Sequence, residues 1–457
     1  MIAANPGQAR RVRKPQRTHA HAVRAGGVLA WLALFASSAC QSASKASPNT
    51  TTHAADAATR HADDDGSVAG GTSSVAHPTY YQHVEPILRS HCVGCHRPAG
   101  AAPFSLATYT AVRTLATSVA SVTHEHRMPP WPAVTEGDCP PQVGARRLDA
   151  ADIALIGAWA SAGAPEGAVP AVLPALPAAW GTLDHVDAVL RSDAAYTPKP
   201  NTDDYRCFIV HPSNAQDRYL TAYAVRQDAP GIIHHVQLWA IDTDADEAQL
   251  DQLDAADSGP GYACPDSIGV NGRYVSVWAP SDPIRRHPPD TGMLLTGGHR
   301  MVVQFHYHDH GQGRSDQTAI ELELSDHVKH PASMWPVSPP DIYLAPGQKS
   351  VNVMGSVAVT GSRPYQLWGV RGHMHTLGSS ERVSLRDGKG DHCLLSIPRW
   401  DSNWQLMYFY EAPVQLAIGS ELDVSCTYDT TSQTAPVRYG IHSTDEMCFG
   451  YFYVTQD

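Results

Sequence analysis

Residues 372–378 read Gly-His-Met-His-Thr-Leu-Gly, within a stretch whose pattern is that of a β-strand. On a strand, residues i and i+2 point to the same face, so His373 and His375 can offer two imidazoles to one metal ion, whereas on a helix they would diverge. Two neutral imidazoles suit copper, zinc, iron or nickel and do not choose among them. The stretch predicts a β-fold with a metal site; the alternative is a pair of half-exposed strand histidines.

The composition favours short strands and many turns. Charged residues make up only 17% of the 457 residues, Gly and Pro number 35 each, and a hydrophobic content of 42% is enough for real cores. The length is that of about three domains. The formal net charge of −12 argues against nucleic acid as a partner, and 25 histidines with nine cysteines indicate metals and an oxidising compartment.

The first 40 residues have the features of an export signal. Residues 1–39 contain six basic residues and no acidic ones, and the basic residues all precede the apolar run Val28–Phe35, which is too short to span a bilayer stably. The run ends at Ser37-Ser38-Ala39-Cys40, which resembles a bacterial lipobox with Ser37 in place of the usual Leu. We expect an exported bacterial lipoprotein anchored to a membrane through Cys40, facing the periplasm or cell exterior; ordinary cleavage would leave Cys40 an incidental thiol. Residues 41–77 are expected to be a disordered linker.

Residues 92–96 read Cys-Val-Gly-Cys-His, the attachment signature of c-type haem. Two thiols, Cys92 and Cys95, add to the vinyl groups, and the adjacent His96 binds the iron. The alternative is a redox dithiol followed by a chance histidine. Helical patterns precede and follow the motif, at residues 80–88 and 151–160, so residues 78–168 resemble a small all-α class I cytochrome c domain.

The second axial ligand is expected to be Met128, in the sequence Arg-Met-Pro-Pro-Trp-Pro. A loop made rigid by proline can fix a thioether, and Met/His ligation raises the haem potential. His124, His126 and, more weakly, His91 are the alternatives.

Residues 169–200 read as an extended Pro/Ala-rich linker with room for one helix near His185. From residue 203 onward the sequence alternates in short runs separated by turn signals, typical of β-sandwiches. The fold class is therefore mainly β, with two consecutive jelly-roll-like β-sandwich domains over 201–330 and 331–457. Strands are expected at 205–210, 219–225, 232–239, 274–278, 300–306 and 319–324.

Three histidine groups fall on these strands, and a soft candidate ligand, Met447, precedes the last one. The groups are His234 with His235, His306 near His308 and His310, and His373 with His375. Adjacent residues on a regular strand face opposite ways, so His234 and His235 can bind one ion only at a strand end or a bulge.

The sequences His-His-Val, Gln304-Phe-His-Tyr, His373-Met-His-Thr-Leu-Gly and Glu446-Met-Cys resemble, in order and spacing, the copper type II ascorbate-dependent monooxygenases. The resemblance covers roughly residues 201–457 and implies two β-sandwich domains, each with one copper ion. It implies an electron-transfer copper held by His234, His235 and His306, and an oxygen-binding catalytic copper held by His373, His375 and Met447. A thioether favours Cu(I) and argues against zinc. The role of His308 stays open: it is either a copper ligand or a residue that contacts one.

The resemblance also implies disulfides Cys426–Cys448 and Cys207–Cys264, while Cys139 and Cys393 are left either bonded to each other or free. Arg371 and Tyr451 match substrate-binding residues of the peptide-hydroxylating branch of the family, but Phe449 replaces the asparagine that completes that anchor. A peptidylglycine substrate is therefore not predicted, and Arg371 is equally open as a surface strand charge.

We expect a copper-dependent monooxygenase with two copper ions and one covalent haem c, which hydroxylates a C–H bond of a small organic substrate with dioxygen. Electrons would come through the haem, from ascorbate or from a redox protein. The alternative is a non-catalytic copper and haem protein, either an electron carrier or a copper-binding lipoprotein.

Overall fold

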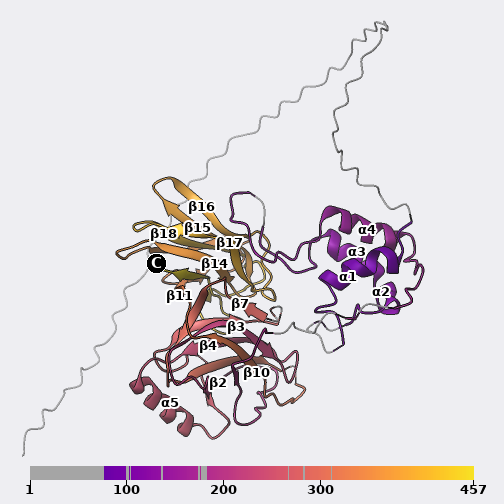
Figure 1. The fold of residues 1–457 in the computed structure, drawn as a ribbon. Coiled ribbons are helices and arrows are strands. Elements are labelled where there is room, and N and C mark those ends of the chain that lie inside the picture. The colour runs from indigo at the N-terminus through magenta and orange to yellow at the C-terminus, as the bar shows by residue number, and fades with distance from the viewer. Residues whose placement is uncertain are drawn as a thin grey trace, which may run out of the picture. The chain divides into compact units, whose positions relative to one another are not determined.

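The computed structural model describes residues 77–98, 102, 104–134, 137–172, 175–176, 183–265, 267–280, 282, 284–309 and 311–456. Within these residues the protein is mainly β, as predicted, and its strands form four sheets (Figure 1). The predicted signal peptide, Cys40 and the linker up to residue 76 lie outside the described residues. Among the described helices, none is long and apolar enough to cross a membrane.

The helices before residue 165 form a group with its own hydrophobic core (Figure 1). Ile156 and Trp159 are fully buried in this core, and α4 begins at Asp149, whose side chain accepts a hydrogen bond from the backbone N–H of Asp152. Both predicted helical stretches are found, the first one as a π-helical turn that continues into α1. The elements are η1 (Tyr80–Val84), α1 (Glu85–His91), α2 (Tyr109–Thr114), α3 (Ala116–His124) and α4 (Ala150–Ser161). That this group is a cytochrome c domain stays a prediction.

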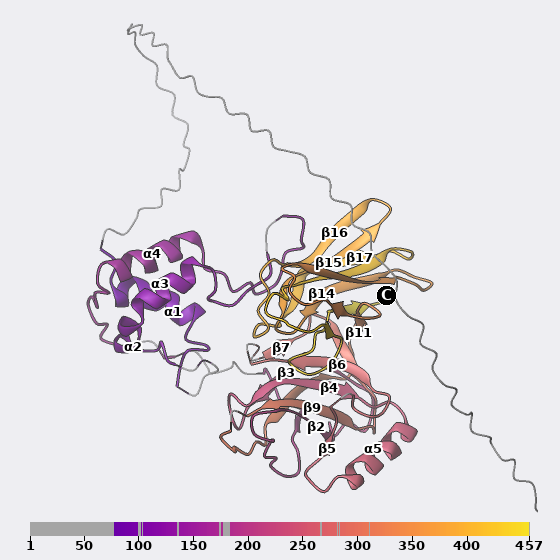
Figure 2. The ribbon, with the colours of Figure 1, turned by 180° about the vertical axis from the view of Figure 1, so that it is seen from behind.

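A five-stranded sheet carries the first histidine group. Its order is β5-β2-β9-β4-β6, and Figure 2 shows β4, β9 and β2 side by side. The strands are β2 (Asp203–Val210), β4 (Ile233–Ala240), β5 (Tyr262–Ala263), β6 (Arg273–Trp278) and β9 (Met301–His308), with helix α5 (Asp244–Ala256) between β4 and β5. The strands predicted at 205–210, 232–239, 274–278 and 300–306 are all present in it.

A nine-stranded sheet extends through both β halves of the chain. Its order is β1-β10-β3-β8-β11-β20-β14-β17, with β7 paired to β3. Strand β11 joins the halves, because it pairs in parallel with β8 of the first half and antiparallel with β20 of the second. The strands are β1 (Ala188–Leu190), β3 (Arg218–Arg226), β7 (Ile284–Arg286), β8 (Thr291–Leu295), β10 (Ala319–Ser325), β11 (His330–Val337), β14 (Tyr365–His373), β17 (Met407–Leu416) and β20 (Phe449–Thr455).

The second half adds a four-stranded sheet of order β13-β18-β15-β16 and a small two-stranded one, β12-β19. One core packs the five-stranded sheet against the nine-stranded sheet, and another packs the four-stranded sheet against it. The fold therefore has two sandwich cores, but one continuous sheet serves both. The strands are β12 (Tyr343–Leu344), β13 (Val351–Ala358), β15 (Gly378–Asp387), β16 (Gly390–Ile397), β18 (Glu421–Tyr428) and β19 (Val437–Arg438).

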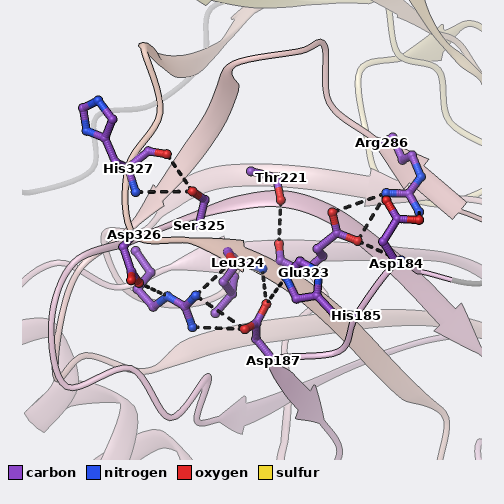
Figure 3. Close-up of polar contacts among 11 residues, drawn as sticks. Asp184, His185, Asp187, Thr221, Arg286, Glu323, Leu324, Ser325, Asp326 and His327 are labelled. Atoms are coloured by element: carbon purple, nitrogen blue, oxygen red, sulfur yellow. Dashed lines mark hydrogen bonds and ion pairs between the residues drawn. The ribbon is translucent and has the colours of Figure 1, made fainter.

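The described end of the Pro/Ala-rich segment, residues 183–200, is attached to the first sandwich. Residues 183–200 contain no helix near His185; instead β1 pairs with β10. Figure 3 shows the polar contacts that hold it: Asp187 accepts a hydrogen bond from the backbone N–H of Leu324 at 2.7 Å, and Asp184 lies 3.1 Å from Arg286. A backbone that pairs with a sheet edge satisfies its N–H and C=O groups there, which favours a strand over a helix.

Candidate functional site

A β-bulge brings the adjacent histidines of the first group to one side. Strands β4 and β9 are neighbours, and their register shifts between Ile233, opposite Tyr307, and His235, opposite His306. His234 is therefore the extra residue of a bulge next to the start of β4. Of the two arrangements that the sequence allows, the structure has the bulge.

Three imidazole nitrogens converge at this bulge. Nδ1 of His235 lies 3.3 Å from Nδ1 of His234 and 3.3 Å from Nδ1 of His306, and one ligand nitrogen from each ring fits within 4.8 Å. Desolvation lowers the pKa of His235 well below its ordinary value, so the ring is neutral, as metal binding requires. The donor set fits a copper ion held by three nitrogens.

Asp203 holds the third ring of this cluster. Its Oδ1 lies 3.0 Å from Nε2 of His306 and 3.2 Å from Nδ1 of His308. A carboxylate on the far nitrogen fixes the orientation of a metal-binding imidazole and leaves Nδ1 for the ion. His308 thus contacts the carboxylate, and it is not part of the convergent group; His310 lies outside the described residues.

The second histidine pair lies at the end of β14. The strand ends at His373, and His375 follows two residues later with its ring centroid 5.3 Å from that of His373. Nδ1 of His373 is hydrogen-bonded to Oε1 of Gln405, and Nδ1 of His375 lies 3.0 Å from the carbonyl oxygen of Asp445. Since oxygen acceptors take the Nδ1 protons, both Nε2 atoms are left to bind a metal ion.

Glu446 connects Met447 to this pair. Its carboxylate accepts hydrogen bonds from the backbone N–H groups of His375 at 2.9 Å, Leu377 at 2.7 Å and Met447 at 3.3 Å. In addition, His373 pairs with Phe449 across β14 and β20, so the chain at Met447 passes the end of β14. The structure thus brings the backbone at Met447 beside His373 and His375, and a set of two nitrogens with a thioether would fit a copper ion that cycles through Cu(I). That the Met447 sulfur joins the two imidazoles as a ligand stays a prediction.

Three disulfides join the described cysteines outside the Cys-x-x-Cys-His motif. Cys426–Cys448 fixes the residue after Met447 to β18, and Cys207–Cys264 lies in the first sandwich; these are the two pairs implied by the resemblance. The third bond, Cys139–Cys393, resolves the pairing that the sequence leaves open. Such bonds are typical of an exported protein.

Arg371 is buried and already engaged. Its Nη2 donates to Oε1 of Gln405 at 3.1 Å, and its guanidinium carbon lies 5.8 Å from the ring centre of Tyr451. Tyr274 of the first sandwich stacks on Tyr451 at 5.2 Å. The cavity beside these residues has a volume of about 10 Å³, which is room for about one water. A substrate-binding role for Arg371 and Tyr451 stays a prediction.

The Cys-x-x-Cys-His motif follows the end of α1. Cys92 and Cys95 are the free cysteines among the described residues, and Nδ1 of His96 lies 3.2 Å from the carbonyl oxygen of Phe104. That contact leaves Nε2 of His96 for an iron ion, so the donors fit a covalent haem. Met128 lines a cavity of about 810 Å³, and so does its competitor His126. Cys92, Cys95, His96, His124 and His91 do not line it.

Three residues with structural roles at these sites escaped the sequence prediction as functional residues: Asp203, Gln405 and Glu446. Glu446 stands next to Met447, so the motif itself carried a signal for it. Gln405 contacts His373 from 32 positions away and lies in a loop without a recognisable pattern, so no local signal could have found it.

Comparison with known proteins supports the resemblance for the β half. Residues 334–456 match the family model of the copper type II ascorbate-dependent monooxygenase C-terminal domain, a range that includes His373, His375 and Met447. Dopamine beta-hydroxylase from Canis lupus familiaris is 20% identical over 300 residues, which are 62% of this chain and 46% of that protein. The chain thus spans less than half the length of this relative.

Solved structures add no argument about fold or function. The infectious bursal disease virus VP2 subviral particle has a TM-score of 0.19 and 11% identity, over 59% of this chain and 72% of that chain. The major capsid protein P2 of bacteriophage PM2 has a TM-score of 0.26 and 8% identity, over 59% of this chain and 96% of that chain.

Proposed function

We propose that this protein is an exported copper-dependent monooxygenase that hydroxylates a C–H bond of a small organic substrate with dioxygen. The observation that carries the proposal is the family match over residues 334–456, a range that contains Met447 and the imidazole pair of His373 and His375, whose ring centroids lie 5.3 Å apart. Dopamine beta-hydroxylase, the matched relative, supports the same reaction class.

The residues of the second site have two roles: some would bind the copper ion, and others orient the residues that bind it. His373, His375 and Met447 would hold copper, which would supply the one-electron chemistry that dioxygen activation needs. Gln405 and the carbonyl of Asp445 orient the two imidazoles, and Glu446 fixes the backbone on both sides of the site. His234, His235 and His306 would hold the copper ion of the first site, which would supply a second electron.

Cys92, Cys95 and His96, together with Met128, would hold a haem c, which would supply electrons to the copper sites. A reductant of the ascorbate class or an exported redox protein would reduce it. The three disulfides indicate an oxidising compartment, which supports a location outside the cytoplasm. A lipid anchor at Cys40 would hold the protein at a membrane.

The test is oxygen uptake by the copper-loaded, ascorbate-reduced full chain across a panel of arylethylamines, glycine-extended peptides and small aliphatic acids. We expect uptake that depends on one substrate class and is absent in copper-depleted protein. Met447→Ala should lose this uptake while keeping the haem spectrum and the first copper. Met354→Ala is the matched control, because Met354 is an exposed strand residue in the same half of the chain.

The non-catalytic alternative predicts a different result from the same samples. It expects two bound copper ions and a reducible haem, but oxygen uptake that no compound of the panel changes and that Met447→Ala leaves as it was.

A further inference from the structure

The cavity that Met128 lines, about 810 Å³ in volume, has walls from two parts of the chain. The helical group and the loop after it contribute one wall, which includes Thr123, Met128 and Ile153. The second sandwich contributes the other, which includes Thr376 and Trp400. Both predicted redox centres therefore have a residue at this cavity: Met128 for the haem, and Thr376, the neighbour of His375, for the second copper.

The loop that carries Met128 is fixed to the second sandwich. The disulfide Cys139–Cys393 links the loop after Met128 to β16, and Val143 donates its backbone N–H to the carbonyl oxygen of Phe409 at 2.8 Å. Trp131, three residues after Met128, is buried in the core of the second sandwich. The Met128 loop is thus built into this sandwich by a covalent bond, a backbone hydrogen bond and core packing.

The lining suits a flat, aromatic and anionic molecule. Indole rings and proline rings offer apolar faces, and three arginines offer partners for carboxylates. The volume is within the range of sites for small molecules and cofactors. The lining residues with these properties are Trp131, Trp400, Trp404, Pro129, Pro130, Pro132, Pro398, Arg127, Arg147 and Arg399.

Trp400 connects this cavity to the second metal site. Its Nε1 donates a hydrogen bond to the carbonyl oxygen of His375 at 3.0 Å, and its backbone N–H donates to the carbonyl oxygen of Ser379 at 2.9 Å. One hydrogen bond therefore separates the cavity wall from the backbone of a predicted copper ligand. No comparable contact between this cavity and His234, His235 or His306 is present among the described residues.

We propose that the cavity receives the edge of the haem and that Trp400 is the residue through which this haem contacts the second copper site. The inference rests on the proposed haem and copper sites, and it adds the point of electron entry. One electron passes from ferrous haem, which becomes ferric, to Cu(II) held by His373, His375 and Met447, which becomes Cu(I). A one-electron donor of the ascorbate class restores the ferrous haem.

The test follows a single electron in the anaerobic full chain with ferric haem and Cu(II) at both sites. Flash photoreduction places one electron on the haem, and two signals are recorded without turnover: the visible band of ferrous haem and the Cu(II) signal in electron paramagnetic resonance. We expect fast haem reoxidation with loss of the Cu(II) signal of the second site. Transfer should persist in His306→Ala, which lacks the first copper, and disappear in His373→Ala, which lacks the second.

Trp400→Phe tests the contact residue, since it keeps an aromatic ring and removes the donor to His375. It should slow the transfer at least tenfold. Trp368→Phe is the matched control, because Trp368 lies on the strand of His373 and donates its Nε1 to Oγ1 of Thr455 at 2.9 Å, away from the cavity, and it should leave the rate within twofold.

The possible failures can be told apart. A protein that binds neither covalent haem nor copper overturns both this inference and the proposed function. If haem and copper are bound but electron transfer needs His306 and not His373, only the electron entry proposed here is overturned. The same holds if the transfer rate is unaffected in Trp400→Phe. The His306→Ala and His373→Ala variants show which copper site receives the electron even if Trp400→Phe loses its second copper.

Discussion

The carboxylate of Asp203 lies 3.0 Å from Nε2 of His306, and its other oxygen accepts a hydrogen bond from Oγ of Ser443 at 2.7 Å. Ser443 belongs to the loop of residues 441–445 that precedes Met447. Tyr205 makes a second link, since its ring stacks on His306 at 4.1 Å and its hydroxyl donates to the carbonyl oxygen of Ile441 at 2.7 Å. The first histidine cluster is thus hydrogen-bonded to the loop that leads to the second site.

Asp203→Asn should weaken copper binding at the first site by about 10- to 100-fold, the usual cost of losing a carboxylate behind a metal-binding imidazole. A chelator competition that follows the Cu(II) signal measures this affinity. Asp217→Asn is the control, because Asp217 is exposed and contacts only a backbone N–H of the loop at Gly297 among the hydrogen bonds described. Equal affinities for the two variants would contradict the positioning role of Asp203.

Glu446→Gln should lower copper occupancy at the second site and leave the first site filled. The amide keeps one acceptor oxygen where the carboxylate accepts three backbone N–H groups, so the turn at His375 and the segment at Met447 lose a shared anchor. Copper content with the second-site spectrum measures the effect, and the exposed Glu411→Gln serves as control. Full occupancy in Glu446→Gln would show that the carboxylate is dispensable for the site.

Replacing Cys139 and Cys393 together by serine should lower the unfolding midpoint of the second sandwich and expose the chain near residues 129–143 to proteases. Loss of a native disulfide typically costs about 2–4 kcal/mol, and this one closes a loop of sequence separation 254. Differential scanning calorimetry and timed proteolysis measure the two effects. The double variant would speak against a fixed loop if it matched the wild type in both.

His287 should make the protein less stable as the pH falls below about 6.5. Its Nδ1–H donates to the carbonyl oxygen of Leu220 at 2.9 Å, while desolvation and the nearby Arg285 guanidinium lower its pKa to about 3. Between the unfolded value of 6.5 and about 3, only the unfolded chain binds this proton, so stability is complete above pH 6.5 and declines below it.

His287→Asn removes the titrating group and keeps a donor for Leu220. Its free energy of unfolding should therefore fall less steeply from pH 6.5 to 4 than that of the wild type. The two proteins should differ by roughly 1–3 kcal/mol over this range, less than the full pKa shift would give, because the His287 ring faces a small cavity. Denaturant titrations at four pH values measure the two slopes. Parallel slopes would assign the acid sensitivity to other groups.

The sequence predicted the strands well because period-two alternation and turn residues are local signals. The joining of the two sandwiches by one sheet could not be predicted, since the pairing of β8 with β11 depends on contacts between strands of different halves. The helix allowed near His185 was wrong for a related reason: β10 offers an edge to residues 188–190 that no local pattern records.

At the candidate sites, the ligand types and spacing were visible in the sequence, but their geometry was not. The bulge at His234 decides whether two adjacent imidazoles face one ion, and it arises from the register of β4 against β9. Likewise, the pairing of Cys139 with Cys393 and the contact of Trp400 with His375 depend on how distant segments fold together.

The measurement that tests the central claim most directly is X-ray absorption at the copper edge of the reduced, copper-loaded protein, together with its copper content. Two copper ions per chain are predicted, with a sulfur neighbour that accounts for half of the copper and is lost in Met447→Ala but retained in Met354→Ala. A single copper per chain, or two copper ions with only nitrogen and oxygen neighbours, would contradict the two copper sites proposed here, one of His234, His235 and His306 and the other of His373, His375 and Met447.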